Sequence, residues 1–165
     1  MSDVSAESLR SGARSVLLLF VHSNLLISLS GTAVAVSTVV LADFPFDPVP
    51  LFIVFAVTLF VYSFNRLADL AEDKRNVPDR ASFVEQYGTV LFVTGGLLYL
   101  IATGIAIVTG IPGAPAMVVP LVVAVLYSVV GVKRILLVKN LLVGLSWGMI
   151  PLGVGVYYGA LRTVD

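Results

Sequence analysis

The feature that most restricts the fold of this chain is a series of long apolar runs. Five stretches contain no Asp, Glu, Lys or Arg residue: 16–41, 51–64, 89–108, 116–132 and 140–161. A helix of about 20 apolar residues is needed to cross the hydrocarbon core of a membrane. The sequence therefore predicts an all-α polytopic transmembrane bundle, a single domain over residues 1–165. Its five spans are expected near 16–41, 51–69, 89–108, 116–132 and 140–161, with a break at Tyr87-Gly88 before the third.

The composition excludes several classes of function. With 58% hydrophobic and 12% charged residues, the chain fits a membrane protein better than a soluble domain. Its net charge of zero and its lack of basic blocks argue against nucleic acid as a partner. The absence of cysteine excludes disulfides, thiolate metal sites and a cysteine nucleophile. The first apolar run is too long for a signal-peptide core, and it is interpreted as a retained helix.

The basic residues of the loops predict an orientation. If five spans alternate across the membrane, nine of the ten Lys and Arg residues fall on the side of the N-terminus. Lys and Arg concentrate in cytoplasmic loops. We therefore expect a multi-pass protein of the cell membrane with its N-terminus in the cytoplasm and its C-terminus outside.

The densest group of charges lies between Asn65 and Arg80 (N-R-L-A-D-L-A-E-D-K-R-N-V-P-D-R), directly after the second apolar run. Asn65, Asp69, Asp73 and Asn76 follow one another at intervals of four, four and three residues. On a continuous helix these intervals place the side chains on one stripe. Stacked carboxylates repel each other unless a cation lies between them. Two carboxylates and an amide oxygen suit a hard ion such as Mg²⁺.

The length of the second run indicates how deep this stripe lies. The 14 residues from Leu51 to Phe64 span about 21 Å of helix, whereas a membrane core is about 30 Å thick. We expect the helix to continue past Asn65 while still inside the membrane, so that Asn65 and Asp69 face a hydrated, protein-lined cavity. The alternative is an ordinary solvated loop whose acids pair with the neighbouring basic residues Lys74, Arg75 and Arg80.

The same stretch resembles a known motif. The pattern Asn65-x3-Asp69-x3-Asp73-x2-Asn76-x-Pro78-x-Arg80 is similar to the first aspartate-rich motif of the UbiA-type intramembrane prenyltransferases. In that family the motif binds the Mg²⁺–diphosphate of an isoprenyl donor. The resemblance therefore implies a metal site at Asn65, Asp69 and Asp73, with Asn65 and Arg80 facing the diphosphate. Arg66 departs from the pattern, because many family members carry Asp or Gln there.

A second stretch, from Tyr127 to Arg134 (Y-S-V-V-G-V-K-R), also resembles this family. There a tyrosine and the basic residues after it approach the cavity from the cytoplasmic end of the fourth helix. The resemblance implies diphosphate-binding roles for Tyr127, Lys133 and Arg134, because fixed cations stabilise a departing diphosphate. The alternative is that Lys133 and Arg134, like Lys139, are anchors at the lipid headgroups.

Polar and small residues inside the apolar runs allow two interpretations. Asn24, on the first span, resembles the polar residue that family members place near the diphosphate. His22, the only histidine, is interpreted as a partner in hydrogen bonding between helices. Gly95-Gly96 and Gly144-x3-Gly148 are interpreted as positions of close helix packing.

The resemblance covers about residues 16–158, the amino-terminal half of a nine-helix UbiA-type enzyme. It implies transfer of an isoprenyl group from an allylic diphosphate to a lipid or aromatic acceptor. Mg²⁺ would be the cofactor, and Asp69, Asp73, Lys133 and Arg134 the catalytic residues. The second aspartate-rich motif of the family has no assigned counterpart here. The alternative is a non-catalytic subunit or remnant, completed by a separate carboxy-terminal half or by a homo-oligomer. A small transporter is a weaker third interpretation, because the sequence contains no internal repeat.

Overall fold

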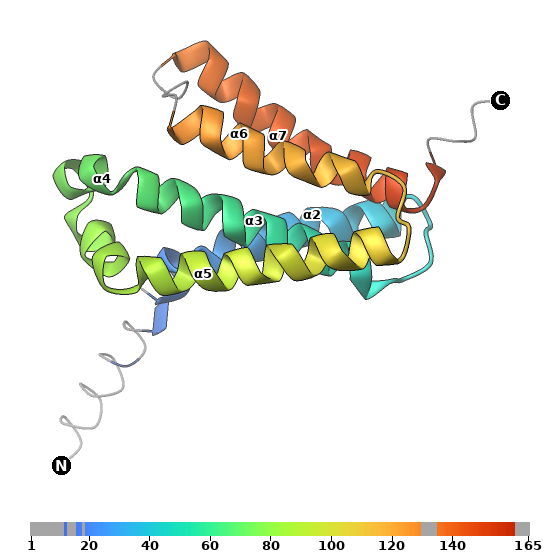
Figure 1. Cartoon of the computed structure of the whole chain (residues 1–165), viewed down its shortest axis with the longest axis horizontal. Helices are drawn as coiled ribbons and strands as arrows, with labels where there is room; N and C mark the ends of the chain where they lie inside the picture. Colours follow the sequence, from blue (N-terminus) through green and yellow to red (C-terminus); the bar gives the residue numbers. More distant parts are fainter. Residues whose placement is uncertain (1–11, 13–15, 18, 130–134, 161–165) are drawn as a thin grey trace.

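The computed structural model describes residues 12, 16–17, 19–129 and 135–160 (Figure 1). Within these residues the chain is helical and has no strand, which confirms the predicted all-α class. The elements are α2 (Leu25–Leu41), α3 (Pro48–Ala68), α4 (Leu70–Asn76), α5 (Pro78–Val108), the 3-10 helix η1 (Ala114–Met117), α6 (Val118–Ser128) and α7 (Leu136–Tyr157).

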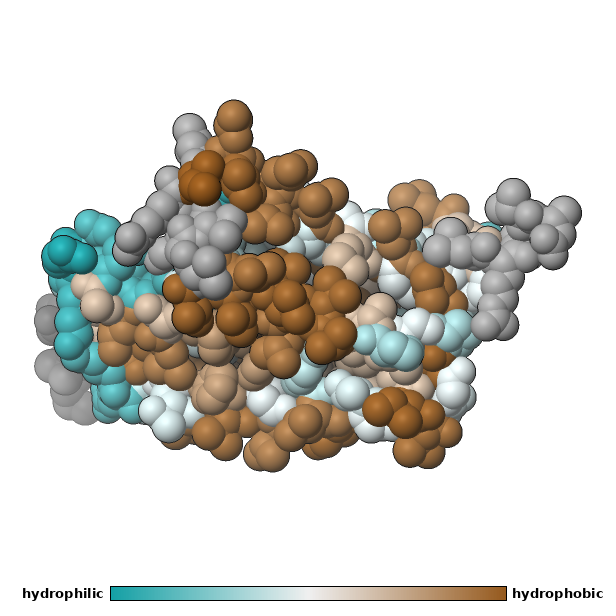
Figure 2. Space-filling model, turned by 45° about the horizontal axis from the view of Figure 1, so that its top comes forward, coloured by the Kyte–Doolittle hydropathy of each residue, from teal (hydrophilic) through white to brown (hydrophobic). Residues whose placement is uncertain are grey.

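Three of the described helices are long and apolar enough to cross a membrane: Pro48–Ala68, Pro78–Val108 and Leu137–Tyr157. Two further apolar segments, Leu25–Leu41 and Ala114–Ser128, are shorter. Figure 2 shows apolar side chains over much of one face of the molecule, whereas hydrophilic side chains gather at the end that carries α4. This distribution is consistent with a membrane protein that has one strongly hydrophilic end.

Helix α3 is the centre of the bundle, because it contacts each of the other described α helices. In Figure 1, α5 lies along one side of α3, and the antiparallel pair α6 and α7 lies along the other. Helix α2 contacts both α3 and α7. The buried residues where these three helices meet are Ala35, Val39 and Val154, against which Val54 and Ile150 pack.

Helices α3 and α5 approach each other closely at Gly95. A Cβ atom at this position would lie 3.1 Å from the Cα atom and 3.3 Å from the backbone nitrogen of Phe60. The Phe60 ring also stacks on Tyr99, one turn along α5, with 5.0 Å between the ring centroids. The packing role predicted for Gly95 is therefore confirmed, and glycine is needed there because the neighbour is backbone.

The predicted break at Tyr87-Gly88 is wrong. Helix α5 begins at Pro78, continues through both residues and ends at Val108. Gly88 serves packing instead, since a Cβ atom there would lie 2.9 Å from the Leu67 Cδ2 atom of α3. The glycine permits a close helix contact without interrupting the hydrogen bonds of its own helix.

The expected continuous helix over 16–41 is interrupted at Ser23 and Asn24. Asn24 adopts a left-handed conformation with φ 64° and ψ 7°, which asparagine tolerates better than most residues. Both residues are buried, and the Asn24 Nδ2 atom donates a hydrogen bond to Ser63 Oγ of α3 at 3.4 Å. The Ser28 hydroxyl donates to the Asn24 carbonyl oxygen at 2.8 Å. Polar partners on α3 and in α2 therefore compensate for the break.

At the opposite end of the bundle, Asp47 fixes the start of α3. The helix begins at Pro48, three residues before the predicted start, and Asp47 Oδ1 accepts a hydrogen bond from the Val49 amide at 2.8 Å. The Tyr157 hydroxyl donates to the other carboxylate oxygen. These two donors, Tyr157 foremost, lower the pKa of Asp47 below its ordinary value. The turn before α3 is thereby attached to the end of α7.

Two expectations for the carboxy-terminal part also differ from the structure. Helix α7 begins at Leu136, so Lys139 lies in a helix and not in the predicted basic connector. A Cβ atom at Gly144 or Gly148 would meet nothing within 4 Å, so the close packing predicted there is absent among the described residues. Only the glycine positions lack a close neighbour, because Trp147 between them contacts α3.

Replacing Gly95 by alanine is expected to destabilise the bundle by about 1–3 kcal/mol, because the new methyl group overpacks the Phe60 backbone. Gly104→Ala in the same helix is the matched control, since a Cβ atom there meets nothing within 4 Å. Thermal unfolding in detergent, followed by circular dichroism, should give a lower midpoint for Gly95→Ala than for the wild type. Equal midpoints for Gly95→Ala and Gly104→Ala would contradict the contact.

Candidate functional site

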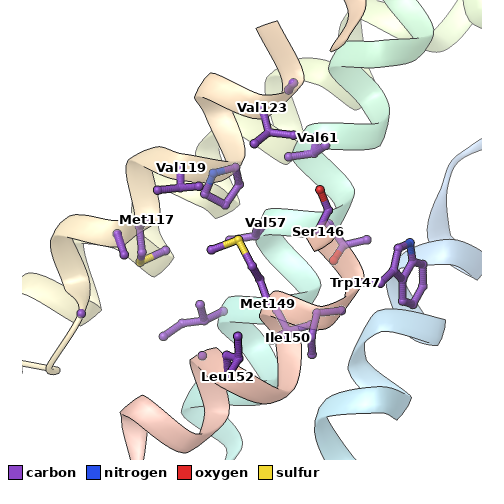
Figure 3. A pocket seen from close by; sticks show the side chains of 18 of the residues that line it. Val57, Val61, Met117, Val119, Val123, Ser146, Trp147, Met149, Ile150 and Leu152 are labelled. Atoms are coloured by element: carbon purple, nitrogen blue, oxygen red, sulfur yellow. The ribbon is translucent and has the colours of Figure 1, made fainter. Parts of the chain in front are cut away.

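A cavity of about 580 Å³ lies between α3, α6 and α7, with residues of η1 and the turn before it contributing to the wall. Most of its wall is apolar. Figure 3 shows Val57 and Val61 of α3, Val119 and Val123 of α6, and Met149 of α7 around the same space. Concave sites with apolar walls and a few convergent polar groups are the usual form of a ligand pocket.

One end of this cavity is polar. Asn65, Arg66, Asp69 and Tyr127 line it there, and we call these four residues the polar end. On α3 the lining residues extend from Asp69 back to Pro50, about 28 Å along the helix axis. The cavity therefore combines a short polar end with a long apolar body, which is the shape and polarity of an amphiphilic ligand.

Asn65 reaches the polar end because α3 continues past the apolar run and ends at Ala68, as the run length predicted. Its amide oxygen accepts a hydrogen bond from the Ser128 hydroxyl, the last residue of α6, at 2.9 Å. This bond joins the ends of α3 and α6 beside the cavity. A carbonyl oxygen has two lone pairs, so the Asn65 oxygen retains capacity for a second partner.

Asp69 lies at the point where the helix is interrupted. It is the C-terminal cap of α3, with φ −95° and ψ 1°, and α4 begins at the next residue. The stripe predicted for Asn65, Asp69, Asp73 and Asn76 requires one continuous helix, and the interruption ends it after Asp69. The structure brings Asn65 and Asp69 together at the cavity, while Asp73 and Asn76 are not among its lining residues.

Asp73 is instead paired with Arg80 from the first turn of α5. The Arg80 Nε atom donates to Asp73 Oδ2 at 2.8 Å, and its Nη2 atom donates to Oδ1. The Asp73 side chain is 7% exposed, and Arg66 Nη1 lies 4.0 Å from its Oδ2 atom. A buried carboxylate needs such a partner because an unpaired buried charge is costly. The pairing alternative is thus confirmed for Asp73 and Arg80.

The remaining predicted site residues do not all lie at the cavity. Tyr127 lines the cavity at its polar end. Asn24 is buried against Ser63 and is not one of the cavity-lining residues. Lys133 and Arg134 lie outside the described residues. The structure therefore assembles Asn65, Asp69 and Tyr127 at one place and leaves Asn24 apart from them.

Sequence reasoning missed three polar groups of the cavity region. Ser128 was part of the second motif but received no role, and it bonds Asn65. Trp147 of α7 donates its Nε1 hydrogen to the Tyr62 hydroxyl of α3 at 3.3 Å, and both residues line the cavity. Trp147 lies inside the Gly144-x3-Gly148 stretch, for which the sequence indicated only helix packing. The available signal was that a tryptophan inside a membrane helix needs a partner for its N–H group.

The chemistry of the polar end rests on oxygen donors and one guanidinium. Among the described residues there is no group of three or more His, Cys, Asp or Glu side chains that could hold a metal ion. The Asn65 amide oxygen and the Asp69 carboxylate still offer the hard oxygen ligands that Mg²⁺ prefers.

Comparisons with protein-family models, with curated proteins and with solved structures find no match to this chain.

Arg80→Ala is expected to destabilise the protein by about 3 kcal/mol, because it leaves the buried Asp73 carboxylate without its main partner. Asp73→Ala in the Arg80→Ala background should recover part of this loss, since the unpaired charge is then gone. Arg75→Ala is the control, because Arg75 is an exposed side chain in the same region. Unfolding midpoints of the four proteins in detergent measure the effect. A double variant no more stable than Arg80→Ala would contradict a pairing role.

Proposed function

We propose that this chain forms the donor-binding side of a UbiA-type intramembrane prenyltransferase site. One observation carries the proposal: a long apolar cavity ends at Asn65 and Asp69, the first two residues of the aspartate-rich pattern. An isoprenyl diphosphate has the matching form, with an anionic head and a long apolar tail. The reaction would transfer the isoprenyl group to a lipid or aromatic acceptor.

In the proposed membrane arrangement, all five apolar segments are spans. Helix α2 with the helical residues 19–22 before it would make the first, and the Ala114–Ser128 segment the fourth. The hydrophilic end with α4 would then lie on the cytoplasmic side with the N-terminus, and the turn at Asp47 would lie outside. The basic residues Lys74 and Arg75 on α4 support this orientation.

Mg²⁺ would be held at the polar end by Asn65 and Asp69, with Asp73 as a further ligand. Bound there, the ion would neutralise charge on the diphosphate and so favour its departure from the isoprenyl carbon. The oxygen donors of Asn65 and Asp69 fit this ion, since Mg²⁺ commonly takes one or two carboxylates and completes its shell with phosphate oxygens and water.

For Asp73 to act as a ligand, its carboxylate has to leave Arg80. We propose an exchange of partners, in which the Arg80 guanidinium moves from Asp73 to the phosphate oxygens. Arginine matches phosphate and carboxylate with the same planar fork of donors, so the exchange conserves its hydrogen bonds. Tyr127, Lys133 and Arg134 would add further contacts to the diphosphate. Asn24 would contribute indirectly to the site, through its hydrogen bond to Ser63 of α3.

A second candidate is a non-catalytic membrane subunit that binds such a lipid without transferring it. It is favoured by one observation, namely that the Asp73 carboxylate is already neutralised by Arg80. A subunit of this kind would share the cavity and the polar end with the enzyme. Formation of a prenylated product distinguishes the two candidates, whereas binding of the diphosphate is common to both.

Geranylgeranyl diphosphate is expected to bind the purified protein in Mg²⁺, and Asp69→Asn should weaken this binding by about tenfold or more, because it removes a charged metal ligand. Asp79→Asn is the matched control, since Asp79 is exposed and does not line the cavity. Calorimetry in detergent measures the affinity. Fluorescence gives an independent readout, because Trp147 is the only tryptophan and lines the cavity. Equal affinity of the wild type and Asp69→Asn would contradict the assigned metal site.

A further inference from the structure

We propose that Arg66 binds the anionic phosphate head of the ligand directly, and that it provides a part of the affinity that needs no divalent cation. This inference rests on the proposed function, because it concerns the same cavity and the same class of ligand. It assigns a role to the residue at which the chain departs from the aspartate-rich pattern.

The position of Arg66 is the first argument. It belongs to the last turn of α3, between Asn65 and Asp69, and it lines the cavity with both of them. Its side chain is 32% exposed and is thus partly withdrawn from solvent at the place where the apolar wall ends. A positive charge in such surroundings interacts more strongly with an anion than it does in bulk water.

The division of partners around Asp73 is the second argument. Both oxygens of this carboxylate receive hydrogen bonds from Arg80, whereas Arg66 approaches it only to 4.0 Å. Arginine carries five N–H donors in a fixed fork. Asp73 therefore engages Arg80 in a bidentate pair and Arg66 only at long range, so Asp73 does not hold the Arg66 fork in a fixed orientation. The Asp69 carboxylate also attracts Arg66, which keeps the guanidinium beside the cavity that both residues line.

The chemistry of the ligand head is the third argument. Phosphate oxygens accept bidentate hydrogen bonds from a guanidinium, and these charge-assisted bonds are stronger than those between neutral groups. Because arginine remains protonated at every accessible pH, its contribution is present with or without Mg²⁺. A lysine at this position would keep the charge but lose the planar fork.

The test measures binding of geranylgeranyl diphosphate in excess EDTA and again in Mg²⁺, using calorimetry and Trp147 fluorescence. In EDTA we expect the wild type to bind measurably and Arg66→Gln to bind about tenfold more weakly or worse. Arg66→Lys should lie between them. Arg75→Gln is the matched control with the same loss of charge on an exposed residue outside the cavity, and it should stay within about twofold of the wild type.

Ligand analogues separate the head from the tail and identify the source of the phosphate. Geranylgeraniol, which lacks the head, should bind the wild type and Arg66→Gln equally. If phosphatidic acid competes with the same dependence on Arg66, the anion site is supported and a membrane lipid is its ligand. Equal affinities of the wild type and Arg66→Gln for the diphosphate in EDTA would overturn the inference, as would wild-type binding only in Mg²⁺.

This outcome is distinguishable from failure of the proposed function. If Asp69→Asn binds as tightly as the wild type in Mg²⁺ while Arg66→Gln still binds more weakly than the wild type in EDTA, the metal site is contradicted and the anion site is supported. The unfolding midpoint of Arg66→Gln, compared with that of Arg80→Ala, shows whether a loss of binding follows from disruption of the Asp73 pair. A midpoint as low as that of Arg80→Ala would mean that Arg66 is a structural partner of Asp73, and would overturn the inference.

Discussion

Polar groups that a helix carries into an apolar bundle have to find partners or a cavity, because no water is present to solvate them. Helix α3 meets this condition in three ways. Its Ser63 accepts a hydrogen bond from the buried Asn24, its Asn65 accepts one from Ser128, and the residues after Asn65 line the polar end of the cavity. These contacts attach the start of α2 and the end of α6 to α3, the close approach at Gly95 brings α5 against α3, and the Trp147–Tyr62 hydrogen bond joins α7 to α3.

The helical class and the continuation of α3 through Asn65 were predictable because they depend on properties that the sequence displays directly. Apolar run length placed α3 and its continuation through Asn65, and small residues marked the contact at Gly95. The interruptions at Asn24 and Asp69 were not predictable by the same means. Helical periodicity assumes that the helix continues, and both interruptions depend on partners that lie elsewhere in the chain or on the cap geometry of a single residue.

In the candidate site, too, residue spacing predicted some positions, whereas partners from other helices determined the rest. Spacing correctly brought Asn65 and Asp69 to one cavity, but it also grouped Asp73 with them, whereas the fold pairs Asp73 with Arg80. That pairing crosses from α4 to α5 and depends on the angle between the two helices. The polar end therefore holds one carboxylate, Asp69, and one guanidinium, Arg66, and Arg66 Nη1 lies 4.0 Å from the paired Asp73. In the proposed function, ligand binding would exchange ion pairs in this region as well as neutralise charge.

In the proposed function, the cavity between α3, α6 and α7 holds the apolar tail of the ligand. Photo-crosslinking with an isoprenyl diphosphate that carries a diazirine in its tail, followed by mass spectrometry, tests this most directly. We predict adducts at cavity residues such as Val61, Val123 and Met149, and their suppression by unlabelled geranylgeranyl diphosphate. Adducts confined to outward-facing residues of α5 such as Leu97 and Ile107, unaffected by competitor, would contradict the account.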